Sequence, residues 1–177
     1  MTGIRSATDH DCGDIHDVYM LAFPERENHI VASLAVSLLG EETSPETIAL
    51  VAEASGKIVG HIAFSPVTAR SESNWSGYIL APLGVKPAYQ KCGVGKKLIE
   101  RGITQLREKA VNVIIVYGDP GYYERYGFSA DAATRFSPPY KLQYPFGWQA
   151  LVLKEGKENE IVGELLCVKS LRNPALW

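Results

Sequence analysis

The chain has 177 residues, of which 46% are hydrophobic and 21% are charged, and its formal net charge is −2. These values predict one soluble domain over residues 1–177, with residues 155–177 as an accessory strand or tail, and they exclude a global attraction to nucleic acid or a membrane surface. No apolar run reaches the roughly 20 residues of a membrane span. Three scattered cysteines and an N-terminus without an apolar signal core predict a reduced, cytoplasmic protein without a disulfide framework or a zinc site.

Hydrophobic periodicity in the first half of the chain predicts two helices between strands. The first strand is expected at Ile4–Thr8, and Gly40 is expected to end the second helix. A hairpin follows, with its turn at Ser55-Gly56 and a β-bulge at Gly60. The predicted helices cover Asp11–Phe23 and Arg26–Leu39, and the predicted hairpin strands cover Ile48–Ala54 and Lys57–Val67.

The second half of the chain alternates strands and helices, which together with the first half predicts an α+β fold. A polar loop is expected over Ser71–Ser76, and Pro82 is expected to interrupt the pairing of the strand that follows. Asp119 and Pro120 predict the N-cap and first turn of a short helix that Gly127 ends. Strands are predicted at Tyr78–Val85, Val111–Tyr117, from Phe128 onward, at Trp148–Lys154 and at Ile161–Val168, with a helix over Lys96–Ala110.

A glycine turn between a strand and a helix carries the strongest chemical signal. The turn reads QKCGVG from Gln90 to Gly95, and the helical pattern begins directly after it. Such a turn presents backbone N–H groups at the positive end of a helix dipole, where a phosphate binds well. Lys91, Lys96 and Lys97 add positive charge, so the sequence predicts a phosphate site here.

Two common phosphate motifs do not fit this turn. A Walker loop needs Ser or Thr at Lys97 and a glycine at Gln90. A dinucleotide fingerprint needs a third glycine at Leu98 and a shorter connection from the strand. A third pattern, Q/R-x-x-G-x-G/A, matches at Gln90, Gly93 and Gly95.

This third pattern resembles the coenzyme-binding motif of the GNAT N-acetyltransferases. LGVKPAYQKCGVGKKLI, residues 83–99, resembles the family's strand 4, pyrophosphate loop and helix 3. GDPGYYERYGF, residues 118–128, resembles its helix 4 in a subgroup of small predicted bacterial N-acetyltransferases. The resemblance covers Ile4–Val152 and implies a GNAT-type fold, a mixed, mostly antiparallel, twisted sheet of roughly six to eight strands flanked by about four helices.

The resemblance also implies acetyl-CoA as a co-substrate and assigns roles to residues. The end of strand 4 would pair with the pantetheine arm, and the N–H of Val85 would be the oxyanion donor. Tyr123 would act as the general acid toward the leaving thiolate, because a tyrosine keeps its proton at neutral pH. The implied coenzyme-binding residues are Leu83, Gly84, Val85, Gln90, Lys91, Cys92, Gly93, Val94, Gly95, Lys96 and Tyr123, and no metal is implied.

The general base is left open by the sequence. Many family members place a glutamate on strand 4, but residues 78–81 contain no carboxylate. Glu53, His61, Glu25 and a water chain are alternatives. Glu27 is predicted to line the acceptor site as a catalytic residue.

The expected acceptor is a primary amine of a small molecule or peptide, acetylated by direct transfer. The resemblance implies that Phe23–Leu39 and the loop Phe136–Trp148 form the walls of the acceptor site. The aromatic and proline-rich composition of that loop is explained equally well by an acceptor contact, core packing or a homodimer contact, and Leu176-Trp177 is expected at the surface. An alternative function, favoured by the missing strand-4 acid, is a non-catalytic acyl-CoA-binding or regulatory module.

Overall fold

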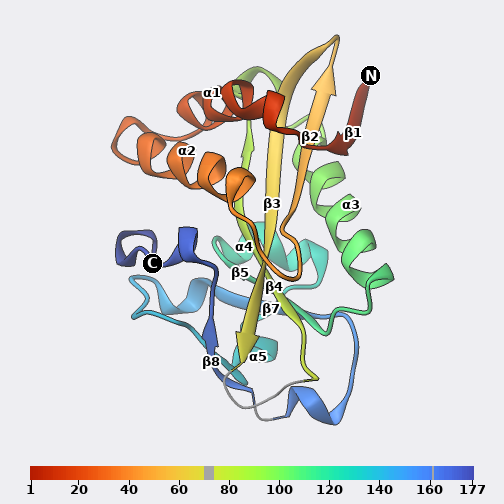
Figure 1. The fold of residues 1–177 in the computed structure, drawn as a ribbon, viewed down its shortest axis with the longest axis vertical. Helices are drawn as coiled ribbons and strands as arrows, with labels where there is room; N and C mark the ends of the chain where they lie inside the picture. Colours follow the sequence, from red (N-terminus) through yellow and green to blue (C-terminus); the bar gives the residue numbers. More distant parts are fainter. Residues whose placement is uncertain (70–73, 161) are drawn as a thin grey trace. The chain divides into compact units, whose positions relative to one another are not determined.

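The computed structural model describes residues 1–69, 74–160 and 162–177 (Figure 1). Over these residues the structure contains eight strands and five α-helices. The strands form a mixed, mostly antiparallel sheet with the order β1-β2-β3-β4-β5-β7, and β8 pairs with β3 and β6. The predicted α+β class is therefore confirmed. The strands are β1 Thr2–Ser6, β2 Ile48–Ala54, β3 Lys57–Ala69, β4 Gly77–Val85, β5 Val113–Tyr117, β6 Phe136–Ser137, β7 Trp148–Val152 and β8 Gly163–Leu166; the helices are α1 Cys12–Ala22, α2 Glu25–Gly40, α3 Val94–Glu108, α4 Pro120–Tyr123 and α5 Ala130–Ala133.

The chain divides into two compact units, and β3, β4 and α3 each contribute residues to both. The first unit comprises Met1–Phe64 and Ala81–Thr104, and the second comprises Ser65–Leu80 and Gln105–Trp177. None of the helices in the described ranges combines the length and hydrophobicity of a membrane span.

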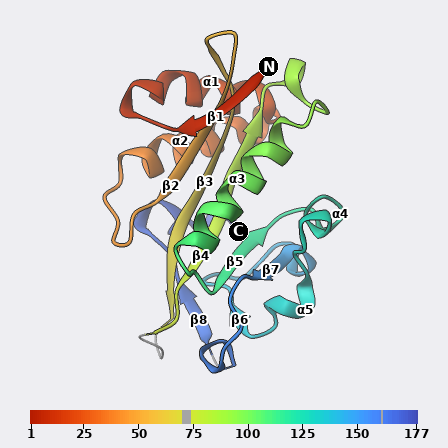
Figure 2. The ribbon, with the colours of Figure 1, turned by 90° about the vertical axis from the view of Figure 1, so that its right-hand side faces the viewer.

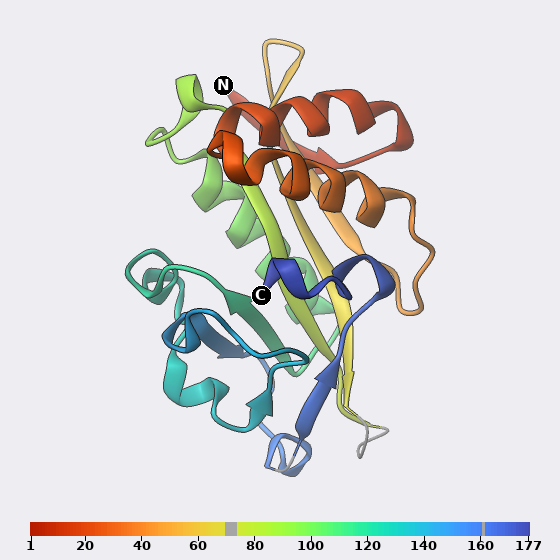
Figure 3. The same ribbon diagram turned by 90° about the vertical axis from the view of Figure 1, so that its left-hand side faces the viewer.

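In the first unit, helices cover both faces of the antiparallel ladder β1-β2-β3. Figures 2 and 3 show α1 and α2 on one face and α3 on the other. α1 buries Ile15, Val18 and Tyr19, whose spacing places them on one side of the helix. On the other face, Gly102 of α3 lies directly against the ring of Phe64, where a larger residue would collide with that ring.

The hairpin of β2 and β3 confirms the predicted turn and bulge. Ser55-Gly56 adopt positive φ angles of 51° and 73°. The pairing register between the strands passes over Val59, next to Gly60, so Val59 is the extra residue of a bulge. The carbonyl of Val59 accepts a hydrogen bond of 2.9 Å from the N–H of Lys86, which ties the bulge to the residue after β4.

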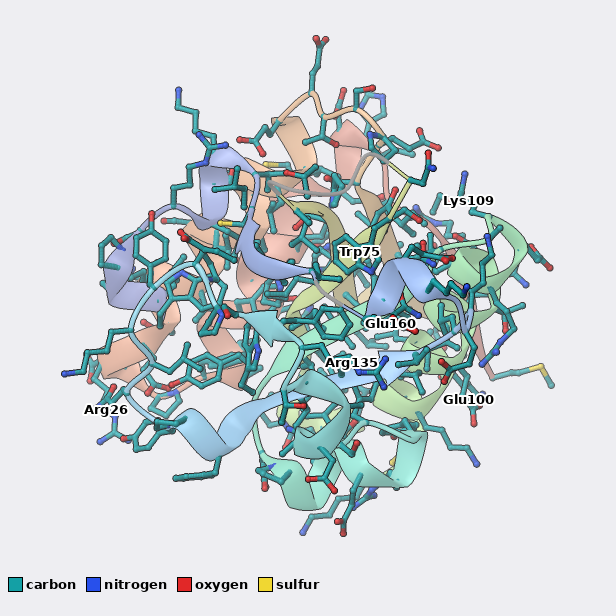
Figure 4. The ribbon with its side chains drawn as sticks, turned by 90° about the horizontal axis from the view of Figure 1, so that it is seen from below. Arg26, Trp75, Glu100, Lys109, Arg135 and Glu160 are labelled. Atoms are coloured by element: carbon teal, nitrogen blue, oxygen red, sulfur yellow. The ribbon has the colours of Figure 1, made fainter. Side chains whose placement is uncertain are left out.

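In the second unit, β5 lies between β4 and β7. It pairs in parallel with Gly77–Leu80 and antiparallel with β7, and its Val113–Val116 segment is buried, as its continuous apolar sequence predicts. The parallel pairing ends at Leu80, before Pro82, as expected for a residue that lacks an N–H donor. Figure 4 shows Trp75 among interior side chains, while Lys109 extends from the surface.

Two predictions for the second unit are wrong. No strand begins at Phe128; Ser129 instead caps α5 by accepting a hydrogen bond of 3.2 Å from the N–H of Ala132. Trp177 is buried rather than exposed, and its indole N–H donates to the carbonyl of Leu171 at 3.0 Å. The other predicted long elements occur with ends shifted by at most about two residues. Residues 71–73 of the predicted polar loop and Ile161 of the predicted last strand lie outside the described residues.

Candidate functional site

The turn before α3 contains two residues in the left-handed backbone region. Lys91 has a φ of 59° and Gly93 a φ of 80°. A Cβ built on Gly93 would meet no heavy atom within 4 Å, so the space beside this residue is open. The N–H of Lys97 donates to the carbonyl of Gly93 at 3.1 Å, and the amides of Val94–Lys96 therefore precede the helical hydrogen-bond pattern. The turn presents helix-end donors beside an open space.

Exposed side chains surround this turn. Cys92 is exposed, as are Lys91, Lys96 and Lys97. Lys96 lies 3.9 Å from Glu100, but both side chains are more than half exposed, so this pair offsets little of the positive charge. The turn is therefore accessible to an anion from solvent.

The side chain of Gln90 joins the turn to the end of β4. Its Nε2 donates to the carbonyl of Val85 at 2.9 Å. This bond uses one of the two lone pairs of the Val85 carbonyl. Gln90 thus holds the turn in place without contributing charge.

Gly84 lies where β4 meets α1. A Cβ at Gly84 would stand 2.7 Å from Cε1 of Tyr19 and 3.2 Å from Cγ1 of Val18. Any side chain at this position would displace α1, so packing requires the glycine. The sequence indicated Tyr19 only as an apolar helix residue, since a contact between positions so far apart leaves no local pattern.

Tyr19 also contacts His61, one of the alternatives for the general base. The Tyr19 hydroxyl lies 2.7 Å from Nδ1 of His61, and both side chains are fully buried. Burial lowers the pKa of His61 to about 3, so the imidazole is neutral near pH 7. A base with so low a pKa accepts a proton from an amine poorly, which argues for a structural role.

The carboxylate alternatives for the base differ in their contacts. Glu53 accepts a hydrogen bond of 3.1 Å from Arg5, so the negative charge of Glu53 is already paired with a guanidinium. Glu27 lies in the first turn of α2, half-exposed, 3.9 Å from Arg26. Of these two, Glu27 has the weaker ionic contact and more access to solvent. Among the described side chains, no group of three or more His, Cys, Asp or Glu residues could hold a metal ion.

The residues after β5 position Tyr123. Asp119 is the predicted N-cap: its Oδ1 accepts the N–H of Gly121 at 2.9 Å. The ring of Tyr123 lies against Gly118, where a Cβ would stand only 2.7 Å from Cε2. Burial raises the pKa of Tyr123 above its usual range, and the hydroxyl therefore stays protonated at neutral pH.

Tyr122 and Tyr126, four residues apart, pack against each other. Their ring centroids are 5.7 Å apart, and the guanidinium of Arg125 lies 5.1 Å from the centroid of Tyr122. Tyr122 also meets Tyr123 edge-on at 5.0 Å. These contacts give α4 and the turn after it an aromatic framework beside Tyr123.

The loop between β6 and β7 contains both buried and exposed aromatic residues. Phe136 and Trp148, at its ends, are buried, whereas Tyr144 and Phe146 are 53% and 66% exposed. The sequence does not distinguish the buried residues from the exposed ones, because all four are aromatic residues of the same stretch.

Comparisons with known proteins agree with this architecture. The domain model described as "Acetyltransferase (GNAT) domain" matches residues 45–130. The uncharacterized N-acetyltransferase YjhQ of Escherichia coli is 39% identical over 134 residues, which cover 75% of this chain and 72% of YjhQ. The crystal structure of the GNAT N-acetyltransferase YhbS from E. coli, in complex with CoA, has a TM-score of 0.83 at 25% identity and covers 97% of this chain and 92% of that chain. A GNAT acetyltransferase from Brucella melitensis, in complex with acetyl-CoA, has a TM-score of 0.64 at 31% identity, covering 88% of this chain and 90% of the other. The chain therefore belongs to the GNAT family of N-acetyltransferases.

Proposed function

We propose that this enzyme transfers the acetyl group of acetyl-CoA directly to a primary amine of a small molecule or peptide. The observation that carries the proposal is the turn before α3, with its left-handed Gly93, the open space beside it and the helix-end amides. This arrangement fits a pyrophosphate, and the similar structures from E. coli and B. melitensis hold CoA and acetyl-CoA. Bound acetyl-CoA supplies the activated acetyl group as a thioester.

Two stretches of backbone would bind the coenzyme. The amides of Cys92–Lys96 would donate to the pyrophosphate oxygens, with Lys91 adding charge and Gln90 holding the turn. The backbone of Leu83–Val85 would pair with the amides of the pantetheine arm. This second role is supported by the end of the β4–β5 pairing at Leu80, which leaves the following residues of β4 outside that ladder.

Backbone and carboxylate groups would assist attack by the amine. The N–H of Val85 would donate to the thioester oxygen as negative charge develops on it. An alkylamine has a pKa near 10.4 in water, so most of it must lose a proton before it can attack. Glu27 would take this proton, directly or through water, since it lies half-exposed in the first turn of α2.

Tyr123 would stabilise the leaving sulfur. Its raised pKa keeps the proton on the hydroxyl until the C–S bond breaks. A thiol has an ordinary pKa of about 8.5, so the Tyr123 hydroxyl first donates a hydrogen bond to the departing thiolate. The hydroxyl proton then passes to the sulfur, and Tyr123 takes up a new proton from solvent. Counted from the alkylammonium ion, the nitrogen gives up two protons, one before attack and one as the amide forms. The thiol product receives one proton, and the other is released to solvent.

Acetyl-CoA binding and thiol release test the proposal together. We expect calorimetry to detect acetyl-CoA binding, and free thiol to accumulate only when both acetyl-CoA and an amine from a chemically varied panel are present. Binding without thiol release from any amine would favour the non-catalytic acyl-CoA module. Absence of binding would overturn the assignment of the turn.

A further inference from the structure

Tyr144 and Phe146 are exceptions among the large apolar side chains of the second unit. Over its described residues, Trp75, Phe128, Phe136, Trp148 and Trp177 are each less than 9% exposed, whereas Tyr144 is 53% and Phe146 66% exposed. Their ring centroids lie 6.0 Å apart, so the two rings form one exposed surface, the Tyr144–Phe146 pair.

The backbone beneath this pair is anchored firmly. The N–H of Tyr144 donates to the hydroxyl of Tyr117 at 2.8 Å, and the N–H of Gly147 donates to the carbonyl of Tyr144 at 2.9 Å. The Tyr117 ring is itself stacked on Trp177, with centroids 6.2 Å apart and planes 13° apart. A loop held in this way presents its side chains at a low entropic cost of binding.

The same anchor also positions Tyr123. The N–H of Gly118 donates to the carbonyl of Gly147 at 3.0 Å, and the ring of Tyr123 lies against Gly118. Since strand-like hydrogen-bonded neighbours lie about 5.5 Å apart and consecutive Cα atoms 3.8 Å apart, the Cα of Phe146 lies within about 10 Å of that of Gly118. Gly147 cannot carry a side chain there, because a Cβ would stand 2.9 Å from the Gly118 carbonyl.

We propose that the Tyr144–Phe146 pair is the acceptor subsite, and that the preferred acceptors are amines carrying an aromatic ring or a large apolar group a short chain away from the nitrogen. This inference rests on the proposed function. The pair lies on the segment that is hydrogen-bonded to Gly118, against which the Tyr123 ring lies, so an acceptor whose nitrogen reacts beside Tyr123 would place its remaining part near the pair. Aromatic rings favour tilted or edge contacts with rings of this kind.

The size of the pair favours a small acceptor over a second copy of the chain. A stable protein–protein interface buries about 800 Å² on each partner. Two aromatic side chains bury about 150–250 Å² each even when fully covered. A single ring of a small amine matches this area, and a dimer interface does not.

The test compares two amines, 2-phenylethylamine and 2-aminoethanol, with acetyl-CoA saturating. We expect Phe146→Ser to lower kcat/KM for 2-phenylethylamine about tenfold to a hundredfold, while kcat/KM for 2-aminoethanol and the acetyl-CoA KM stay within about twofold. Phe146→Tyr should restore most of the loss. The matched control is Leu21→Ser, which removes an apolar side chain of similar exposure, 59%, from α1 and should leave both amines unaffected.

The possible failures are distinguishable. An equal loss for both amines, or no loss for either, overturns the subsite while the acetyltransferase proposal stands. A wild-type dimer that Phe146→Ser dissociates, measured by light scattering, overturns it in favour of a contact between copies. If the wild-type enzyme binds acetyl-CoA but acetylates no amine, the proposed function itself fails, and the subsite with it.

Discussion

Tyr123 holds its proton because its surroundings disfavour a phenolate. Its ring lies against the backbone of Gly118 and meets Phe128 at a centroid distance of 5.8 Å. The packing comes from the ring and the pKa effect from burial of the hydroxyl, so the two can be separated by removing the oxygen alone.

Tyr123→Phe is expected to lower kcat about a hundredfold, the usual contribution of a positioned acid, and to leave acetyl-CoA affinity within about twofold. Steady-state kinetics and calorimetry measure the two quantities. Tyr126→Phe, a hydroxyl deletion in the same segment, serves as the control and should change neither. Unchanged turnover of Tyr123→Phe between pH 6 and 9 would rule out Tyr123 as the acid.

His61 makes the stability of the protein depend on pH. Its folded pKa of about 3 lies below the unfolded value near 6.5, so the unfolded chain binds the proton first as pH falls. The stability that neutral His61 contributes is therefore complete above about pH 6.5 and is lost toward pH 3. Asp11, whose pKa hydrogen bonds from Arg5 lower to about 2, acts in the same direction but only below about pH 4.

Denaturant unfolding between pH 7 and pH 4.5 should accordingly show a loss of stability that approaches about 1.4 kcal/mol per pH unit from His61 alone. His61→Asn keeps an oxygen near the position of Nδ1 as a partner for Tyr19 and removes the titration. We expect this variant to be less stable at pH 7 but to have a flatter pH profile. Parallel profiles for the two proteins would contradict the assignment.

The turn before α3 is an element whose function lies in its backbone. Gly93 occupies a φ region that L side chains rarely adopt, and the space beside it is open. Side-chain identity in the turn therefore matters less than the absence of a side chain at this position.

Gly93→Glu is expected to weaken acetyl-CoA binding about a hundredfold or more, because a carboxylate would stand where the pyrophosphate binds and two like charges about 4 Å apart repel by several kcal/mol. Calorimetry measures the affinity. Gly13→Glu introduces the same charge at another open glycine, in α1, and should bind acetyl-CoA normally. Equal affinities for the two variants would exclude the turn as the binding site.

For helices, strands and turns, the sequence predicts the features that a local pattern of residues determines. Apolar spacing located the long helices and strands, and Asp119-Pro120 and Gly127 marked both ends of the segment containing Tyr123. The four-residue α5 was missed, because one helical turn gives too short a period to recognise. The burial of Trp177 and the contacts of Tyr19 with Gly84 and His61 were also missed, since they join residues distant in the chain.

On the scale of the whole molecule, three elements link the two units covalently. β3, β4 and α3 each run from one unit into the other. All three tryptophans, Trp75, Trp148 and Trp177, belong to the second unit, whereas the turn before α3 belongs to the first. Fluorescence therefore reports on one unit, while the pyrophosphate of the proposed ligand would bind residues of the other.

We expect the units to unfold together. Urea transitions followed by tryptophan fluorescence and by far-ultraviolet circular dichroism should coincide. Acetyl-CoA at about 100 times its Kd should raise the free energy of unfolding measured by either probe by about 2.7 kcal/mol. A fluorescence midpoint that stays unmoved while the dichroism midpoint shifts would mean that the units unfold separately.

Because Cys92 is exposed, a thiol reagent can label the protein without any mutation. Cys92 stands in the turn itself, in contact with solvent, whereas Cys167 is buried and Cys12 is only partly accessible. A maleimide probe would thus report on whether the turn is covered, with no engineered label and no knowledge of which amine the enzyme acetylates. A residue whose side chain has no role in the proposed chemistry thus becomes the means of screening for whatever occupies the turn.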